Sequence, residues 1–166
     1  MQVRSRSLVE AGALIAVESL TWTAGTWWQS RVLPRYGVVA LARVGGLVLA
    51  AGIALSAVIV SGAPLWLAYT GVAIAGLGMG VIFPCAMLAS MGQARQGREG
   101  EAVAARFVAG RLGIALGAGL AGAAVAVSTT AGAPLSHGLA VAFGGCVLVA
   151  VLGVLAAGGL REGAPS

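Results

Sequence analysis

The sequence predicts an all-α integral membrane protein with five transmembrane helices. Three observations predict it: the composition, the lengths of the apolar runs and the charge of the loops between them. Of the 166 residues, 59% are hydrophobic and 9% are charged, with neither lysine nor aspartate. A water-soluble domain carries about a quarter charged residues because its surface needs them. A chain with so little charge has an outer surface that faces lipid.

Long apolar runs separated by short turns define the expected helices. Each run is about long enough for a hydrocarbon core of roughly 30 Å at a rise of 1.5 Å per residue. The five helices are expected over residues 8–30, 38–60, 65–90, 101–127 and 138–160. The second and fifth contain almost no polar residue, so we expect them mainly to touch lipid and neighbouring helices. Together the helices form a single partial transmembrane domain over residues 1–166.

The loops alternate in charge along the chain. Arginines occur in the loops at 31–37 and 92–100, and none occurs in those at 61–64 and 128–137. The positive-inside rule therefore places the first pair and the C-terminus in the cytoplasm of a multi-pass protein of the cell's inner (plasma) membrane. Arg4 and Arg6 oppose this scheme, and the conflict disappears if residues 1–7 belong to a loop of a longer chain.

The positive net charge predicts topology and not a nucleic-acid partner. Basic residues lie at the ends of apolar runs, whereas a nucleic-acid binder gathers them on one soluble face. Cys85 and Cys146 lie within apolar runs, which indicates small buried or lipid-facing residues and not a disulfide or a metal pair. No nucleophile, base and orienting group stand together, so we expect no enzyme, no metal and no cofactor.

A polar stripe in the first helix is the main candidate site. At helical spacing one side carries Glu18, Thr21, Trp22, Gly25 and Gln29. A carboxyl group near mid-membrane is costly and by default marks a functional site. Two interpretations remain open: a cavity wall with a protonatable group, or a protonated Glu18 that only hydrogen-bonds a neighbouring helix.

The third helix contains a glycine-rich stretch before a proline. Gly76 and Gly80 form a small-xxx-small pair that lets another helix approach closely. A phosphate-binding loop is excluded because the following Lys-Ser/Thr is missing. Pro84 has no N–H to donate to the Gly80 carbonyl, so we expect a kink. The kink is either a static bend or a hinge.

The fourth helix combines glycines with two arginines. Gly113 and Gly117 form a second close-packing pair. Arg106 lies near enough to the helix start to reach the cytoplasmic headgroups. Arg111 lies deeper, and it is either a long side chain reaching the headgroups or a cation in a cavity.

Three stretches together resemble the major facilitator superfamily, specifically helices eight to twelve of its C-terminal half. They are LTWTAGTWWQSR at 20–31 with Arg35-Tyr36-Gly37, the glycine-rich stretch at 76–84, and RLGIALGAGL at 111–120. Of the superfamily's cytoplasmic loop pattern, only Arg31, Arg35 and Gly37 match.

The resemblance implies the C-terminal fragment of a drug-exporter-like secondary transporter working by alternating access and proton-coupled efflux. Its partners would be the lipid bilayer, a small-molecule substrate and the missing N-terminal half, or another copy. The residues expected to meet substrate or protons are Glu18, Trp22, Gln29 and Arg111. The alternative is a self-standing small membrane protein that acts by helix–helix assembly, without transport.

Overall fold

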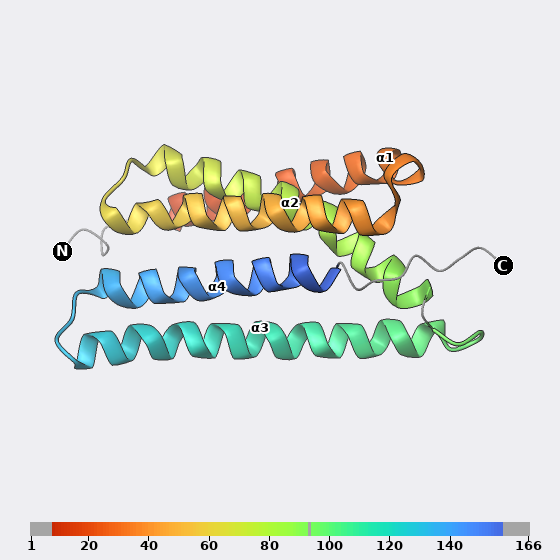
Figure 1. The fold of residues 1–166 in the computed structure, drawn as a ribbon. Helices are drawn as coiled ribbons and strands as arrows, with labels where there is room; N and C mark the ends of the chain where they lie inside the picture. Colours follow the sequence, from red (N-terminus) through yellow and green to blue (C-terminus); the bar gives the residue numbers. More distant parts are fainter. Residues whose placement is uncertain (1–7, 93, 158–166) are drawn as a thin grey trace.

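The computed structural model describes residues 8–92 and 94–157 and consists of helices joined by short turns (Figure 1). The helices are α1 (Leu8–Ala57), α2 (Leu65–Gly92), α3 (Glu99–Thr130) and α4 (Leu135–Ala157), with a 3-10 turn η2 (Val58–Ser61) after α1. Each α-helix is long and apolar enough to cross a membrane. The all-helical, membrane-type prediction is confirmed at this level.

Helix α1 reverses direction at Gly37, whose φ of 74° and ψ of 166° are non-helical. We call residues 8–36 the N-arm and residues 38–57 the C-arm. This backbone conformation is essentially restricted to glycine, because any Cβ would clash with the chain. The chain therefore reverses at a single residue without a loop, and Figure 1 shows the two arms folding back on each other.

Contacts with α2 fix the direction of the N-arm. The Tyr69 hydroxyl donates to the carbonyl of Glu10 at 3.4 Å. Further along both helices, Thr26 Oγ1 donates to the carbonyl of Gly80 at 3.1 Å. Since residue numbers rise together in these two contacts, the N-arm and α2 run parallel.

The C-arm runs in the opposite direction along α2. A Cβ built on Gly45 would lie 3.0 Å from the Ile82 nitrogen, and one on Gly52 would meet Ala75. Residue numbers on one helix rise as those on the other fall, so this pair is antiparallel. Helix α2 is therefore held by two arms of α1 that point in opposite directions.

The predicted loop at 31–37 is wrong, and the count of five separate helices is not confirmed. The first expected helix continues through Pro34 to the reversal at Gly37, the second begins directly after it, and the label α1 covers both. Pro34 lacks the N–H of a helical hydrogen bond and crowds the turn before it, yet the helical backbone continues past it, and the reversal comes three residues later at Gly37. The arginines and Pro34 together predicted a loop over 31–37, whereas in the structure only Gly37 departs from helical geometry.

Other helix ends differ from the prediction by a few residues. Helix α3 extends past the expected end at 127 to Thr130, and in this last turn the Ser128 and Thr129 hydroxyls donate to carbonyls one turn back. It begins at 99 and not 101, α4 begins at 135 and not 138, and α2 ends at 92 and not 90. The C-arm ends its α-helix at Ala57, and residues 158–160 lie outside the described residues.

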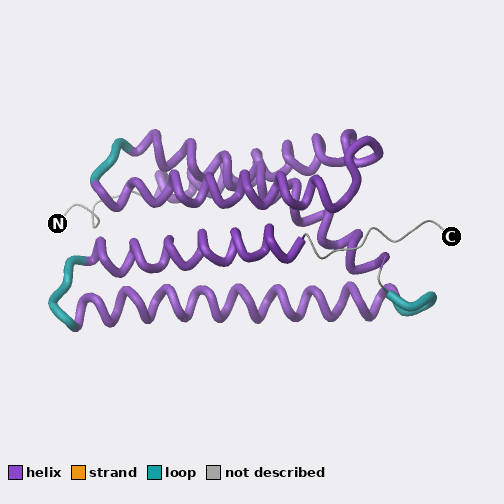
Figure 2. The backbone as a smooth tube through the Cα atoms, in the orientation of Figure 1, coloured by secondary structure: helices purple, strands orange, loops and turns teal. Residues whose placement is uncertain are grey.

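The helices form layers, as Figures 1 and 2 show. Helices α1 and α2 pack together, α4 lies against α1, and α3 lies on the far side of α4. The apolar core is a cluster near Gly37 made of Leu41, Ala42, Val81 and Cys85. No described residue of α3 is buried.

Candidate functional site

The interface between the N-arm and α2 contains most of the predicted site residues. A Cβ on Gly76 would collide with Thr21 Oγ1 and lie 2.7 Å from the carbonyl oxygen of Glu18. A Cβ on Gly80 would collide with the carbonyl oxygen of Trp22. The close approach expected of this glycine pair is present, and its partner is the N-arm.

Thr26 compensates for the hydrogen bond that Pro84 cannot make. Helix α2 continues through Pro84, which leaves the Gly80 carbonyl without its helical donor. The Thr26 hydroxyl lies 3.1 Å from that carbonyl and 3.1 Å from the carbonyl of Trp22 in its own arm. Sequence reasoning did not single out Thr26, although it lies one turn after Trp22 and next to Gly25 of the polar stripe.

The side chains of Trp22 and Gln29 contact α2 and do not line an open cavity. The Gln29 side chain is 3% exposed, and its Nε2 donates to Cys85 Sγ at 3.6 Å. The Trp22 ring lies 5.7 Å from that of Phe83, centroid to centroid, in a tilted arrangement. These contacts support a packing role for both residues within this chain.

Glu18 differs from the other stripe residues in the exposure of its side chain. Its carbonyl oxygen lies in the interface beside Gly76 and accepts from Thr21 Oγ1 at 3.0 Å. The residue itself is exposed on the outside of the bundle. Glu18 therefore stays exposed, whereas Gln29, on the same side of the N-arm, is buried against α2.

Arg111 and the predicted close-packing glycines of α3 are not covered by other described residues. A Cβ on Gly113 or Gly117 would find no atom within 4 Å, and Arg111 is exposed. Within the described part of the chain, the predicted close-packing pair has no partner. None of the described residues covers this packing surface.

A second glycine interface joins the C-arm to α2 and was missed by the sequence analysis. A Cβ on Gly71 would lie 2.5 Å from Ser56 Oγ, and one on Gly78 would meet Leu49 and the carbonyl of Gly45. The C-arm therefore packs closely against α2 along one side and keeps exposed residues such as Val44 and Leu47 on another. The available signal was the spacing of seven between Gly45 and Gly52, with Ser56 one turn further on.

Most of the described arginines lie at or near one end of the bundle. We call the end formed by Gly37 and the loop 94–98 the arginine end. Described arginines at or near it are Arg31, Arg35, Arg43, Arg95, Arg98 and Arg106. The opposite turns, 62–64 and 131–134, carry no arginine. Figure 2 shows these loops at the two ends of the bundle.

Local contacts occupy some of the charges at this end. The Arg31 guanidinium carbon lies 3.4 Å from the Trp27 ring centroid. Arg98 and Glu101 form a salt bridge of 2.5 Å, and Glu99 Oε1 accepts from the Gly97 amide at 3.1 Å. Arg35 is exposed, and no described contact joins it to Gly37 in a gating network.

Within residues 8–92 and 94–157, no three histidine, cysteine or acidic side chains gather in a way that could hold a metal ion. The features of the described residues that bear on function are therefore the helix–helix interfaces and the exposed ionisable groups. No family model, no curated protein and no solved structure matches this chain.

Proposed function

We propose that this chain is one membrane-embedded bundle of a secondary active transporter and crosses the bilayer five times. In this proposal a second bundle, from a longer chain or a separate one, covers the N-arm and α3. Substrate passes between the two bundles as they alternate between inward-facing and outward-facing states. From the resemblance to the major facilitator superfamily, the proposal further includes proton-coupled efflux of a small molecule.

The observation that carries the proposal is the exposure of two ionisable residues at membrane depth. Glu18 lies nine residues along the N-arm from Trp27, a residue type that favours the headgroup level. At a rise of 1.5 Å per residue, this depth is about 14 Å. Arg111 lies twelve residues from Glu99, about 18 Å along α3.

Leaving such groups against lipid is unfavourable. A charged side chain at mid-helix costs about 2.5–3.5 kcal/mol on insertion scales, and such residues normally face other helices or a water-filled cavity. A covering bundle would remove both Glu18 and Arg111 from lipid and use the open glycines of α3 for close packing. Both features favour a face that belongs to an inter-bundle cavity.

The arginine end supplies the orientation in this proposal. The positive-inside rule places it, with the C-terminus, in the cytoplasm of the plasma membrane. Single cysteines in the loops, introduced after replacement of Cys85 and Cys146, test the placement with an impermeant thiol reagent. Labelling of position 97 from outside intact cells contradicts this orientation.

The second candidate function is assembly of identical copies without transport. The observation favouring it is that Gly113 and Gly117 form an open pair on a helix with no buried residue. Another copy of the chain could cover this surface as well as a different bundle does. The two proposals differ in what lies against α3.

Photo-crosslinking in native membranes distinguishes them. A photoreactive residue replaces Gly113, and a matched one replaces Val149, an exposed residue of α4. Crosslinks from position 113 to a different set of transmembrane helices support the transporter. Crosslinks to the same chain support self-assembly, and crosslinks to lipid alone, as expected at position 149, refute both.

A further inference from the structure

Exposed tryptophans lie on the N-arm close to the arginine end. The Trp27 side chain is 60% exposed, and its neighbour Trp28 is exposed as well. The Arg31 guanidinium, one turn further toward the reversal, lies over the Trp27 ring. Tryptophan favours the headgroup level of a membrane, because its ring is apolar and its N–H is polar. These residues therefore mark one candidate boundary of the lipid.

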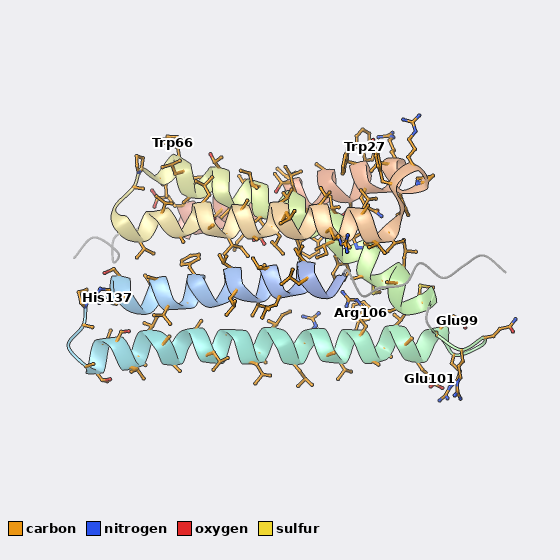
Figure 3. All side chains as sticks on the ribbon, viewed as in Figure 1. Trp27, Trp66, Glu99, Glu101, Arg106 and His137 are labelled. Carbon is orange, nitrogen blue, oxygen red and sulfur yellow. The ribbon has the colours of Figure 1, made fainter. Side chains whose placement is uncertain are left out.

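Another exposed tryptophan lies at the opposite end of the same layer. Trp66 is 64% exposed and is the second residue of α2. Figure 3 shows Trp27 and Trp66 toward opposite ends of the α1–α2 layer, both on the side away from α4. Trp66 therefore marks a second candidate boundary.

The register of the N-arm on α2 gives the separation of the two boundaries. Tyr69 follows Trp66 by three residues, and its hydroxyl donates to the carbonyl of Glu10. The N-arm runs parallel to α2, and Trp27 lies seventeen residues after Glu10, or about 26 Å. The three residues between Trp66 and Tyr69 raise the separation to about 30 Å. The hydrocarbon core of a bilayer has the same thickness, roughly 30 Å.

The N-arm side chains between the two levels are suited to lipid. Ile15 and Leu20 are exposed and apolar. The exposed hydroxyls of Ser19 and Thr23 donate to backbone carbonyls one turn back, at 2.8 and 2.9 Å, and so need no water as a partner. Glu18 is the ionisable residue of this stretch, and in the proposed transporter it faces the cavity between the bundles.

The apolar core of the chain lies beyond the Trp27 level, toward the arginine end. Gln29 donates to Cys85, a member of that core, and Val32 and Leu33 pack against the same cluster. Among the described residues, every buried apolar side chain larger than alanine belongs to it. Lipid gives helices no hydrophobic reason to bury such side chains, whereas water does. The position of the core therefore indicates that this end of the bundle lies in water.

We propose that the exposed tryptophans bind the two headgroup layers of a bilayer, Trp27 and Trp28 at the arginine end and Trp66 at the opposite end. Residues 29–36 then project about 12 Å beyond the lipid into water, with the apolar cluster as the core of the projecting part. The inference rests on the membrane crossing of the proposed function, and it holds with or without transport.

Depth-dependent quenching of tryptophan fluorescence tests this position in the purified chain. Two variants keep one tryptophan each, Trp27 or Trp66, and carry phenylalanine at the other tryptophan positions. The vesicles are phosphatidylcholine with bromine either near the headgroup or near the end of the acyl chains. Both variants should be quenched more strongly by the bromine near the headgroup.

The matched control places a tryptophan deeper in the same arm. Leu20→Trp, with all natural tryptophans replaced by phenylalanine, lies at an exposed position seven residues from Trp27, about 10 Å deeper. Its fluorescence should be quenched more strongly by the bromine near the end of the acyl chains. The opposite order of quenching in the control and in the Trp27 variant supports the position.

Four outcomes overturn the inference, and they have different meanings. A Trp27 profile equal to that of position 20 removes the boundary at the arginine end, and deep quenching of Trp66 removes the opposite one. Quenching at position 20 without quenching at Trp27 assigns Trp27 to a protein contact. No quenching in any variant refutes the membrane crossing itself, and with it the proposed function. Shallow quenching of Trp27 and Trp66 keeps the inference even if photo-crosslinking refutes both proposed functions.

A second measurement leaves every tryptophan in place, in case the substituted variants do not fold. Tyr36→Cys and Leu20→Cys, both at exposed positions of the N-arm, are made after replacement of Cys85 and Cys146 by alanine. In nanodiscs, where both faces of the bilayer are open to water, Tyr36→Cys should react with an impermeant thiol reagent and Leu20→Cys should not. Equal reaction at the two positions contradicts the boundary at Trp27.

Discussion

The α1–α2 half and the α3–α4 half of the molecule use the same small residues with different results. Glycines of α2 lie against backbone atoms of both arms of α1, and hydrogen bonds cross that interface. The glycines from Gly110 to Gly122 on α3 meet nothing within 4 Å. The comparison teaches that glycine spacing gives a helix the capacity for close packing, whereas the neighbour decides whether that capacity is used.

The largest effect should come from filling the packed interface. Gly80→Val should destabilise the chain by about 3 kcal/mol, because the added atoms meet the backbone of the N-arm and not a flexible side chain. Gly117→Val is the matched control, and it should stay within about 0.5 kcal/mol of the parent. Unfolding in detergent by a denaturing surfactant measures both. Equal losses would remove the distinction between the two halves.

The next effect concerns the reversal within α1. Gly37→Ala should cost about 1–3 kcal/mol, because φ of 74° with ψ of 166° is strained for any residue with a Cβ. Gly100→Ala, in a helical and open position of α3, should cost nothing and gain helix propensity. The same unfolding titration compares them. A neutral Gly37→Ala shows that the reversal is made in another way.

A smaller effect should follow removal of the hydroxyl that caps the Gly80 carbonyl. Thr26→Val keeps the shape of the side chain and leaves that carbonyl without a donor, at a cost of about 1 kcal/mol. Thr129→Val, whose hydroxyl bonds only within α3, should be neutral. Thr26→Ser should restore the parent stability. If Thr26→Val matches Thr129→Val, the bond to Gly80 contributes no stability.

The smallest change in stability should occur at the exposed Glu18. Glu18→Gln keeps the shape and hydrogen-bonding capacity and should alter stability by no more than about 0.5 kcal/mol. If the chain is part of the proposed transporter, this variant, together with the second bundle, should accumulate normally and lose proton-coupled flux, because glutamine cannot ionise. Flux across a pH series in proteoliposomes measures it. Transport equal to that of the parent at every pH leaves Glu18 with a packing role alone.

Particular residues show how far the sequence carries the fold. The apolar runs predicted the helices because a long charge-poor run has few other stable forms in lipid. Pro84 predicted that the Gly80 carbonyl loses its helical donor, because this effect is local to one turn of α2. The partner of that turn, Thr26, lies 54 residues away and depends on which helix packs beside α2.

The candidate site was predicted less well for the same reason. Helical spacing placed Glu18 and Gln29 on one side of the N-arm, and that side is broad. The structure puts Gln29 in an interface and Glu18 outside it, because α2 covers only part of the stripe. A sequence gives the angle between two side chains on a helix, whereas the width of the neighbour decides which are buried.

The reversal at a single glycine also affects how the chain reaches the bilayer and how it is degraded. With no loop between them, we expect the N-arm and the C-arm to enter the membrane as one hairpin. Proteases cut preferentially at exposed loop tips. Trypsin acting at the arginine end should therefore cleave first at Arg95 and Arg98, while the helical Arg31 and Arg35 resist. Limited proteolysis thus separates α1–α2 from α3–α4 and leaves the hairpin whole.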